Sequence, residues 1–242
     1  MANPFTLEGL RIAITGAGGG IGSTAARLAA GLGADVMVSD LAVPEAVAES
    51  VRERGRLSQA AALDVTDRAA VEAWAESCGA VDALIDCAAI CPFDDWTEAG
   101  WDEVAERVFD INLHGPLHLV RAFMGSMAER GGGRIALVGS IAGRIGGLVS
   151  APHYVMSKGA IHSFVRWCSR RGAPHNVLVN AVAPGPVRTP MTASQTFDTS
   201  YFPLARMAEA EEIAGPLVFL VSPAASYVSG AVLDINGAMH FS

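Results

Sequence analysis

Short apolar segments alternate with longer, alanine-rich amphipathic segments along the whole chain. The short segments are uninterrupted apolar runs, many of them rich in β-branched residues, which is typical of buried strands. They predict strands at 10–15, 35–40, 60–65, 81–86, 133–140, 177–184 and 231–237. The longer segments predict helices near 20–33, 44–55, 67–78, 99–130, 152–171 and 209–222.

The regular alternation of strand and helix predicts one α/β domain. Parallel strands need crossover connections, and the helix in each connection covers a face of the sheet. Because crossovers are right-handed, we expect a Rossmann-like, doubly wound parallel sheet of about seven strands with helices on both faces. No linker, charge block or repeat divides the chain, so residues 1–242 are expected to form a single domain.

Composition narrows the classes of function. Hydrophobic residues make up 51% of the 242 residues, and the mean hydropathy is +0.33. The net charge of −8 provides no basic surface for nucleic acid, and no apolar run approaches the roughly 20 residues of a membrane span. The first residues lack the pattern of a signal peptide, and the four cysteines (Cys78, Cys87, Cys91 and Cys168) lack a metal-ligand spacing. We therefore expect a soluble cytoplasmic protein with free thiols and no bound metal.

A glycine-rich turn links the first predicted strand to the first predicted helix. Gly16 permits a tight turn, while Gly20 and Gly22 let the backbone approach a pyrophosphate at the helix N-terminus. Asp40 ends the next predicted strand, about 20 residues further on. A carboxylate there accepts hydrogen bonds from the ribose hydroxyls of NAD and repels the extra phosphate of NADP. The segment predicts an NAD site, and the alternatives are a flexible loop and a solvated aspartate.

A tyrosine and a lysine stand four residues apart in the stretch APHYVMSKGA. Helical spacing places Tyr154 and Lys158 on one face, one turn apart. An ammonium near a phenol favours the phenolate, so the pair predicts an acid/base group with a pKa below the free value of about 10. Taken alone, the pair is more simply explained as an ordinary helix face with a half-buried ring and a solvated amine.

Together these motifs resemble the short-chain dehydrogenase/reductase family. The glycines have the spacing TGxxxGxG, Ser140 lies fourteen residues before Tyr154, and Lys158 follows in the sequence YVMSK. The resemblance extends from Leu10 to about Gly237 and keeps the order of the family's motifs. It implies an oxidoreductase that transfers a hydride between NAD(H) and a secondary alcohol or ketone.

The resemblance implies a catalytic set of four residues. Tyr154 is the expected general acid/base on the substrate oxygen, and Lys158 is expected to lower the pKa of that phenol and to bind the nicotinamide ribose. Ser140 is expected to hydrogen-bond the reacting oxygen and orient it. Asn112 matches the asparagine whose helix distortion seats a water that links the lysine to solvent. A proton donor and a polarising hydroxyl on one carbonyl are what reduction by a hydride-carrying cofactor requires.

The resemblance also implies where the cofactor binds. Asp64 and Val65 match the pair that flanks the adenine, and Val187 and Thr189 are expected near the nicotinamide carboxamide. The implied cofactor contacts are Gly16, Gly20, Ile21, Gly22, Asp40, Asp64, Val65, Cys87, Ala88, Lys158, Val187 and Thr189.

The match fails after the fourth predicted strand. The family usually has Asn-Asn-Ala-Gly there, and this chain has Asp86, Cys87, Ala88 and Ala89. The small alanines preserve backbone contacts, but Asp86 loses an amide donor and brings a buried charge that needs a partner. We expect an effect on local stability and cofactor affinity more than on the chemistry, and we expect Cys87 to pack rather than to take a redox role.

Three segments are expected to form the substrate pocket, namely ICPFDDW, IAGRIGGLVSAPH and PVRTPMTASQTFDTSYF, with a lid-like loop at about 186–208. They offer no cluster of arginines for a phosphate or carboxylate; Arg144 and Arg188 are expected at the surface or an interface. His153 is expected to face solvent at a helix start, with substrate contact as the alternative. The expected substrate is a small neutral secondary alcohol or ketone, and a polyol or cyclic diol is the alternative. The NAD preference points to the oxidising direction.

Other functions remain open alternatives. A catalytically silent NAD-binding regulator is disfavoured because the four catalytic positions are intact. A nucleotide-sugar epimerase or dehydratase resembles a longer chain with an added substrate domain, and ketoacyl substrates on an acyl carrier commonly go with NADP. Apolar helices near 112–130 and 152–171 and the tail LDINGAMHFS resemble the surfaces through which the family forms homotetramers; a homodimer is the alternative.

Overall fold

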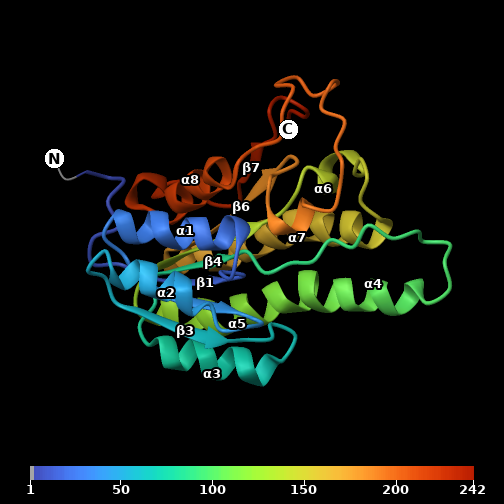
Figure 1. The fold of residues 1–242 in the computed structure, drawn as a ribbon. Coiled ribbons are helices and arrows are strands. Elements are labelled where there is room, and N and C mark those ends of the chain that lie inside the picture. The colour runs from blue at the N-terminus through green and yellow to red at the C-terminus, as the bar shows by residue number, and fades with distance from the viewer. Residues whose placement is uncertain (1–2) are drawn as a thin grey trace.

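Seven parallel strands form the centre of the computed structural model, which describes residues 3–242 (Figure 1). Their order across the sheet is β3-β2-β1-β4-β5-β6-β7, so the direction of winding reverses between β1 and β4. Such a switch point opens a crevice at the carboxyl ends of the strands. The strands are β1 (Arg11–Thr15), β2 (Asp35–Asp40), β3 (Ser58–Ala62), β4 (Ala83–Asp86), β5 (Gly133–Val138), β6 (Val177–Pro184) and β7 (Val232–Ile235).

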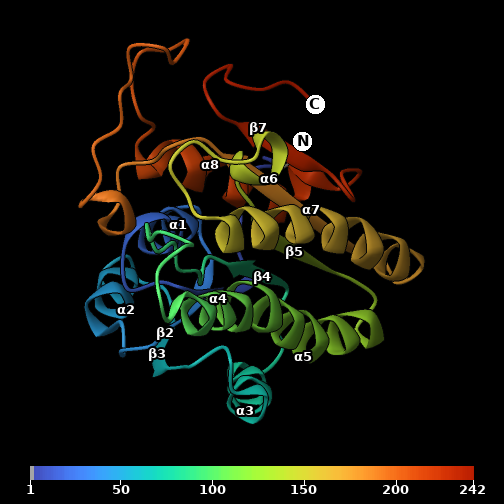
Figure 2. The same ribbon diagram turned by 90° about the vertical axis from the view of Figure 1, so that its right-hand side faces the viewer.

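Helices cover both faces of the sheet (Figures 1 and 2). One apolar cluster joins α1, α2 and α8 to one face, and a second joins α3, α5 and α7 to the other. The helices are α1 (Gly20–Gly31), α2 (Glu45–Arg52), α3 (Arg68–Cys78), α4 (Trp101–Phe109), α5 (Gly115–Glu129), α6 (Ala142–Ile145), α7 (Pro152–Gly172) and α8 (Ala210–Val221). Because the central strands are buried on both sides, they appear in the sequence as uninterrupted apolar runs. The doubly wound sheet predicted from the sequence is confirmed.

Three elements differ from the sequence prediction. The third strand begins earlier and ends at Ala62, which pairs with Asp40 at the end of β2. As an edge strand β3 has no second neighbour, so it stops where its one partner stops. The predicted helix at 99–130 is two helices joined by a π-helical turn at Asp110–His114. The short helix α6, directly after β5, has no apolar period long enough to predict it.

The segment after β6 forms a long excursion that leaves the sheet and returns to it (orange in Figure 1). A parallel bridge between Val187 and Ala208 closes its base, and the Arg188 N–H donates to the Ala208 carbonyl over 2.8 Å. Residues 188–207 therefore form a loop pinned at both ends beside the carboxyl edge of the sheet.

Within residues 3–242, no helix combines the length and the apolar character that crossing a bilayer requires.

The turn between β1 and α1 has no space for side chains. Gly16 has φ +63°, and a Cβ there would lie 2.5 Å from the carbonyl carbon of Cys87. A Cβ on Gly22 would lie 2.2 Å from the Gly16 carbonyl oxygen. The first turn of α1 is thus packed directly against the loop before it, which brings the helix N-terminus to the switch point.

We expect Gly22→Ala to lower the free energy of unfolding by about 1–3 kcal/mol, because the added methyl has no room and the backbone must shift. The matched control is Gly31→Ala, at the other end of α1, where an added Cβ meets nothing within 4 Å. That variant is expected to be neutral or slightly stabilising. Urea unfolding measures both, and equal stabilities would contradict the packing described here.

Candidate active site

Residues from separate elements converge at the carboxyl edge of β4, β5 and β6. Ser140 follows β5, and Tyr154 and Lys158 lie one turn apart on α7. All three line a cavity of about 140 Å³, together with Val187 and Thr189 from the start of the loop after β6. The structure therefore brings the three predicted catalytic side chains to one place.

The Lys158 ammonium is buried, with 3% of the residue exposed. Its Nζ donates to the Val138 carbonyl at the end of β5 over 2.9 Å and lies 5.6 Å from the centre of the Tyr154 ring. Burial lowers the pKa of Lys158, and the nearby Asp86 carboxylate opposes that change. The ammonium is held on the catalytic face of α7 and is not the solvated amine of an ordinary helix surface.

Tyr154 is half-buried at the wall of the cavity. Burial is the largest influence on its phenol and raises the pKa above the ordinary value, while hydrogen bonding with the Ser140 side chain works in the opposite direction. The prediction of a lowered pKa is therefore wrong. The reason is that removal of water from the phenol outweighs the hydrogen bond with Ser140, which lowers the pKa.

Asn112 lies in the π-helical turn between α4 and α5 and is buried. Its Oδ1 accepts from the Ile90 N–H over 3.0 Å, and its Nδ2 donates to the Ile90 carbonyl over 2.9 Å and to Ser157 Oγ over 3.2 Å. The side chain thus ties the segment after β4 to α7 directly behind Lys158. The water-linking role that the resemblance implies for Asn112 stays a prediction.

Asp86 ends β4 and is 3% exposed. Its Oδ1 accepts from Thr15 Oγ1 over 2.6 Å and from the Ala88 N–H over 3.1 Å. Burial raises the pKa of the carboxyl, and these two hydrogen bonds and Lys158 work against the change. The buried acid therefore has the partners that the sequence required, and Cys87 beside it packs against the apolar cluster of α1, α2 and α8.

A second cavity, of about 340 Å³, opens from the catalytic one toward the end of β2. Ten of the twelve predicted cofactor contacts line it; Val187 and Lys158 line the catalytic cavity instead. Ile90, Arg107 and Ile111 also line this cavity and were not among the predicted contacts. They come from the irregular segment after β4 and from the helices that follow, whose sequence carries no motif that would have identified them.

The chemistry of the second cavity fits a dinucleotide. Gly19 precedes α1 in an extended conformation and provides no side-chain cap, so the first N–H groups of the helix are free to meet a pyrophosphate. The Asp40 carboxylate is fixed by the Gly18 N–H over 2.8 Å and the Leu41 N–H over 2.7 Å. A fixed anion at the end of β2 suits ribose hydroxyls and disfavours an additional phosphate.

His153, expected to face solvent, is fully buried. Its Nε2 lies 3.0 Å from Asp94 Oδ1, and its ring stacks on Trp101 with the centroids 5.2 Å apart. The prediction failed because residue 94 lies in the irregular segment after β4, whose return over the start of α7 no sequence period reveals. The contact ties that segment to the helix that carries Tyr154.

The two arginines near the pocket differ from one another. Arg144 is largely buried and pairs with Asp234 on β7 over 3.3 Å, so it does not lie exposed at the surface, and its expected place at an interface stays a prediction. Arg188 is exposed and pairs with Glu209 over 3.1 Å, as expected of a surface residue. Neither residue lines the catalytic cavity.

His162 is a buried histidine that the sequence did not single out. It lies on α7, and a Cβ on Gly139 would come within 2.5 Å of its Nε2, which has no hydrogen-bond partner among the described residues. Burial lowers the pKa of His162 to about 4, and Arg144, Arg166 and Lys158 add to the effect while Asp234 opposes it. The ring is therefore a neutral support directly beneath the residue that precedes Ser140.

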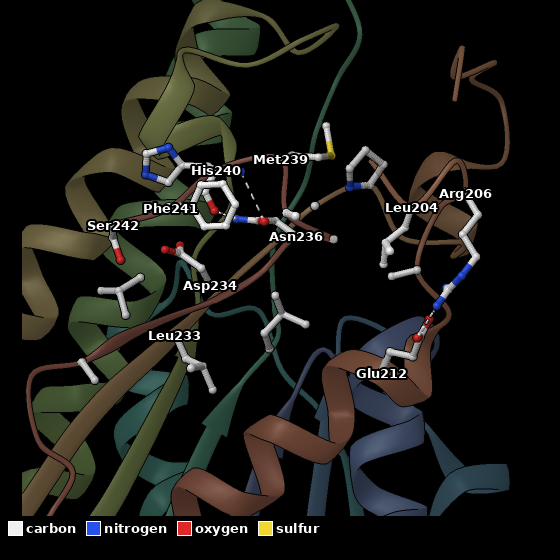
Figure 3. Close-up of a pocket in the computed structure, with 18 residues that line it drawn as sticks. Leu204, Arg206, Glu212, Leu233, Asp234, Asn236, Met239, His240, Phe241 and Ser242 are labelled. Atoms are coloured by element: carbon white, nitrogen blue, oxygen red, sulfur yellow. Dashed lines mark hydrogen bonds and ion pairs between the residues drawn. The ribbon is translucent and has the colours of Figure 1, made fainter. Parts of the chain in front are cut away.

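A larger cavity, of about 630 Å³, lies between the C-terminal tail, β7 and α8 (Figure 3). Arg206 pairs with Glu212 on one side of it, and Asn236 Nδ2 donates to the His240 carbonyl over 3.1 Å on the other. None of the predicted catalytic side chains lines this cavity. Although this cavity is larger than the one lined by Ser140, Tyr154 and Lys158, it is not the candidate active site.

Comparisons with known proteins agree with this geometry. Residues 16–240 match a family model described as enoyl-(acyl carrier protein) reductase. A galactitol 2-dehydrogenase (L-tagatose-forming) of Cereibacter sphaeroides is 37% identical over 96% of both chains. An L-rhamnose 1-dehydrogenase (NAD(P)(+)) of Sphingomonas sp. (strain SKA58) is 35% identical over 97% of both chains. The crystal structure of a short-chain type dehydrogenase/reductase from Mycobacterium marinum superimposes with a TM-score of 0.92 at 29% identity, covering 99% of this chain and 98% of that one.

We expect the free energy of unfolding to fall by about 1–2 kcal/mol between pH 7 and pH 5 through His162. Its folded pKa of about 4 lies below the ordinary value of 6.5, so the unfolded chain binds more protons across this interval and acidification favours unfolding. The variant His162→Gln should have a flatter dependence on pH. The control is His175→Gln, at an exposed position. If both variants followed the wild-type curve in urea titrations, the assigned environment of His162 would be wrong.

Proposed function

This chain belongs to the short-chain dehydrogenase/reductase family, and on that premise we propose that it is an NAD-dependent oxidoreductase that interconverts a neutral secondary alcohol and its ketone. The observation that carries the proposal is the convergence of Ser140, Tyr154 and buried Lys158 on one cavity, next to a second cavity lined by ten of the twelve predicted cofactor contacts. One domain holds both the cofactor and the substrate, and the loop at about 186–208 acts as the lid.

Ser140 and Tyr154 have different roles at the reacting oxygen of the substrate. Ser140 donates a hydrogen bond to that oxygen and orients it, while Tyr154 gives it a proton during reduction and takes the proton during oxidation. The bound nicotinamide supplies or accepts the hydride. Burial raises the pKa of Tyr154 above the ordinary value and so favours the protonated phenol. Oxidation needs the phenolate, so this direction is favoured by alkaline conditions.

Lys158 and Asn112 serve the phenol and the cofactor. Lys158 provides a cation 5.6 Å from the Tyr154 ring centre and is placed to meet the ribose hydroxyls of the nicotinamide half. Asn112 holds Ser157 and, through it, the turn of α7 that carries both catalytic residues; Ser157 Oγ donates to the Tyr154 carbonyl over 2.8 Å. We propose that this network keeps the proton path open to solvent.

The preference for NAD follows from Asp40. Its carboxylate is fixed at the end of β2 by two backbone N–H groups, and neither Gly19 nor Leu41 supplies a cation for the additional phosphate of NADP. The name of the rhamnose dehydrogenase includes both cofactors, so the family alone does not decide between them. The negative charge of Asp40, with no cation at positions 19 and 41, supports NAD.

A polyol or sugar is the second candidate substrate class. It is favoured by the names of two relatives, which act on galactitol and on L-rhamnose. Both classes share the same chemistry at the carbinol carbon, so the choice between them depends on the remaining pocket walls.

We further propose a cytoplasmic homotetramer, with a homodimer as the smaller alternative. Exposed aromatic and apolar side chains on α7 support an interface: Trp167 is 56% exposed and stacks on Phe164, and Met156 is 53% exposed. The described cysteines are all free, as is usual in a reducing compartment.

We expect Tyr154→Phe to reduce kcat for oxidation of a secondary alcohol by about 10²–10⁴-fold, because the phenol is the proton acceptor. The Kd for NAD should change little, since the ring remains. Reduced nicotinamide absorbance measures turnover, and titration calorimetry measures binding. Full turnover in the variant would remove Tyr154 from the mechanism, whereas wild-type protein that binds NAD but turns over no substrate would favour a silent regulator.

We expect Asp40→Asn to shift the ratio of kcat/KM for NAD over NADP toward NADP by at least about tenfold, because one repulsive charge is lost while an oxygen acceptor remains for Gly18. Asp102→Asn, which changes an exposed carboxylate on α4 outside both cavities, is the matched control. The ratio is obtained from initial rates with each cofactor. A wild-type preference for NADP would contradict the assignment of NAD.

A further inference from the structure

The walls of the catalytic cavity indicate which neutral substrate enters. We propose that the pocket takes a small apolar, aliphatic or alicyclic secondary alcohol or ketone, and that it discriminates against polyols and sugars. This inference rests on the proposed function and narrows it to a substrate class. The proposed substrate class differs from the sugar and the polyol in the names of two relatives that match the chain over almost its whole length.

The side chains beyond the catalytic and cofactor residues are predominantly apolar. Most of them come from the three segments predicted to form the pocket, and none of them is charged. They include Cys91, Phe93, Leu148, Val149, Met191 and Phe197. Lys158 is the one charged residue among the described residues that line the cavity, and its ammonium is already bound to the Val138 carbonyl.

The few polar groups in these walls are mostly occupied. Thr192 Oγ1 donates to the Val187 carbonyl over 2.6 Å and accepts from the Thr189 N–H over 3.2 Å. Burial raises the pKa of Cys91 to about 12, so its sulfur is a neutral thiol and a weak hydrogen-bonding group. The hydroxyls of Thr189 and Ser150 then remain. Thr189 is expected to lie near the nicotinamide carboxamide, which leaves Ser150 as one additional hydroxyl for a substrate.

A polyol would lose hydration in this pocket without replacing it. Ser140 and Tyr154 satisfy the reacting oxygen, and Ser150 can satisfy one more. Further substrate hydroxyls would meet apolar walls, and each unpaired polar group is costly. An apolar pocket discriminates against one added hydroxyl by about 10²-fold, so several hydroxyls at the walls produce a strong preference for the apolar substrate.

The mouth of the cavity exposes apolar surface that a substrate can cover. Leu148 is 43% exposed, Val149 is 47% exposed and Met191 is 39% exposed, and all three line the cavity. An apolar substrate gains free energy by removing these side chains from water, and a hydrated polyol gains little. The surface around the opening therefore favours the same class as the interior.

The cavity measures about 140 Å³, and the nicotinamide has to share it with the substrate, because the expected nicotinamide contacts Val187 and Lys158 line it. A small substrate is therefore expected. Cyclohexanol and short secondary alcohols such as 2-pentanol are therefore suitable probes.

The test compares kcat/KM for cyclohexanol and 2-pentanol with that for galactitol and L-rhamnose, at saturating NAD. We expect the better of the two apolar alcohols to exceed both sugars by at least about 100-fold. Turnover of galactitol or rhamnose at an equal or higher kcat/KM would overturn the substrate class and leave the proposed oxidoreductase intact. An absence of reduced nicotinamide with every probe, in protein that binds NAD, would overturn the proposed function itself.

A variant tests the walls directly. Leu148→Asn should raise KM for the preferred apolar alcohol by about tenfold with little change in kcat, because Leu148 contacts the substrate body and not the reacting oxygen. Leu57→Asn, at an exposed position outside all the described cavities, is the matched control and should leave KM unchanged. Calorimetric NAD binding verifies that both variants are folded. An unchanged KM in Leu148→Asn would overturn the proposed apolar contact.

Discussion

The buried ammonium of Lys158 is the constraint around which the active site is organised. A cation without water needs nearby acceptors or anions. The Val138 carbonyl at the end of β5 accepts its hydrogen bond, and the Asp86 carboxylate at the end of β4 acts on it through its charge. The helix that carries Lys158 must also approach α6 closely, and it does so at Gly143, where a Cβ would lie 2.6 Å from the Gly159 nitrogen. The burial of the Lys158 charge therefore depends on the ends of β4 and β5 and on the close contact between α6 and α7.

The same edge of the sheet joins cofactor and substrate. The reversal of strand order between β1 and β4 opens the crevice. In the glycine turn before α1, backbone atoms pack directly against each other and leave no room for a Cβ at Gly16 or Gly22. Ile21, Cys87 and Thr189 line both cavities, so the two sites are continuous. In the proposed mechanism, a dinucleotide bound in the second cavity extends its nicotinamide into the first, where Val187 and Lys158 lie beside Ser140 and Tyr154.

Sequence patterns predicted what local chemistry determines. The apolar runs located every strand, and the glycine turn, Asp40, Ser140 and the Tyr154–Lys158 pair indicated the edge of the sheet where they meet. The patterns did not predict what depends on distant partners. The end of β3 is set by β2, and His153 is buried by a segment with no period of its own. The pKa of Tyr154 depends on how much water the folded pocket admits, which residue spacing does not encode. The proposed substrate class likewise depends on which groups in the pocket walls already hold hydrogen bonds, and residue spacing does not show this.

The most direct test of the account follows one hydrogen atom. The protein is incubated with NAD and a secondary alcohol that carries deuterium on the carbinol carbon, and the reduced cofactor is analysed by mass spectrometry. We expect deuterium to appear in the nicotinamide ring. If hydride transfer limits turnover, the labelled alcohol should also react more slowly than the unlabelled one. Reduced cofactor without deuterium, formed while the alcohol is oxidised, would contradict direct transfer between the two cavities.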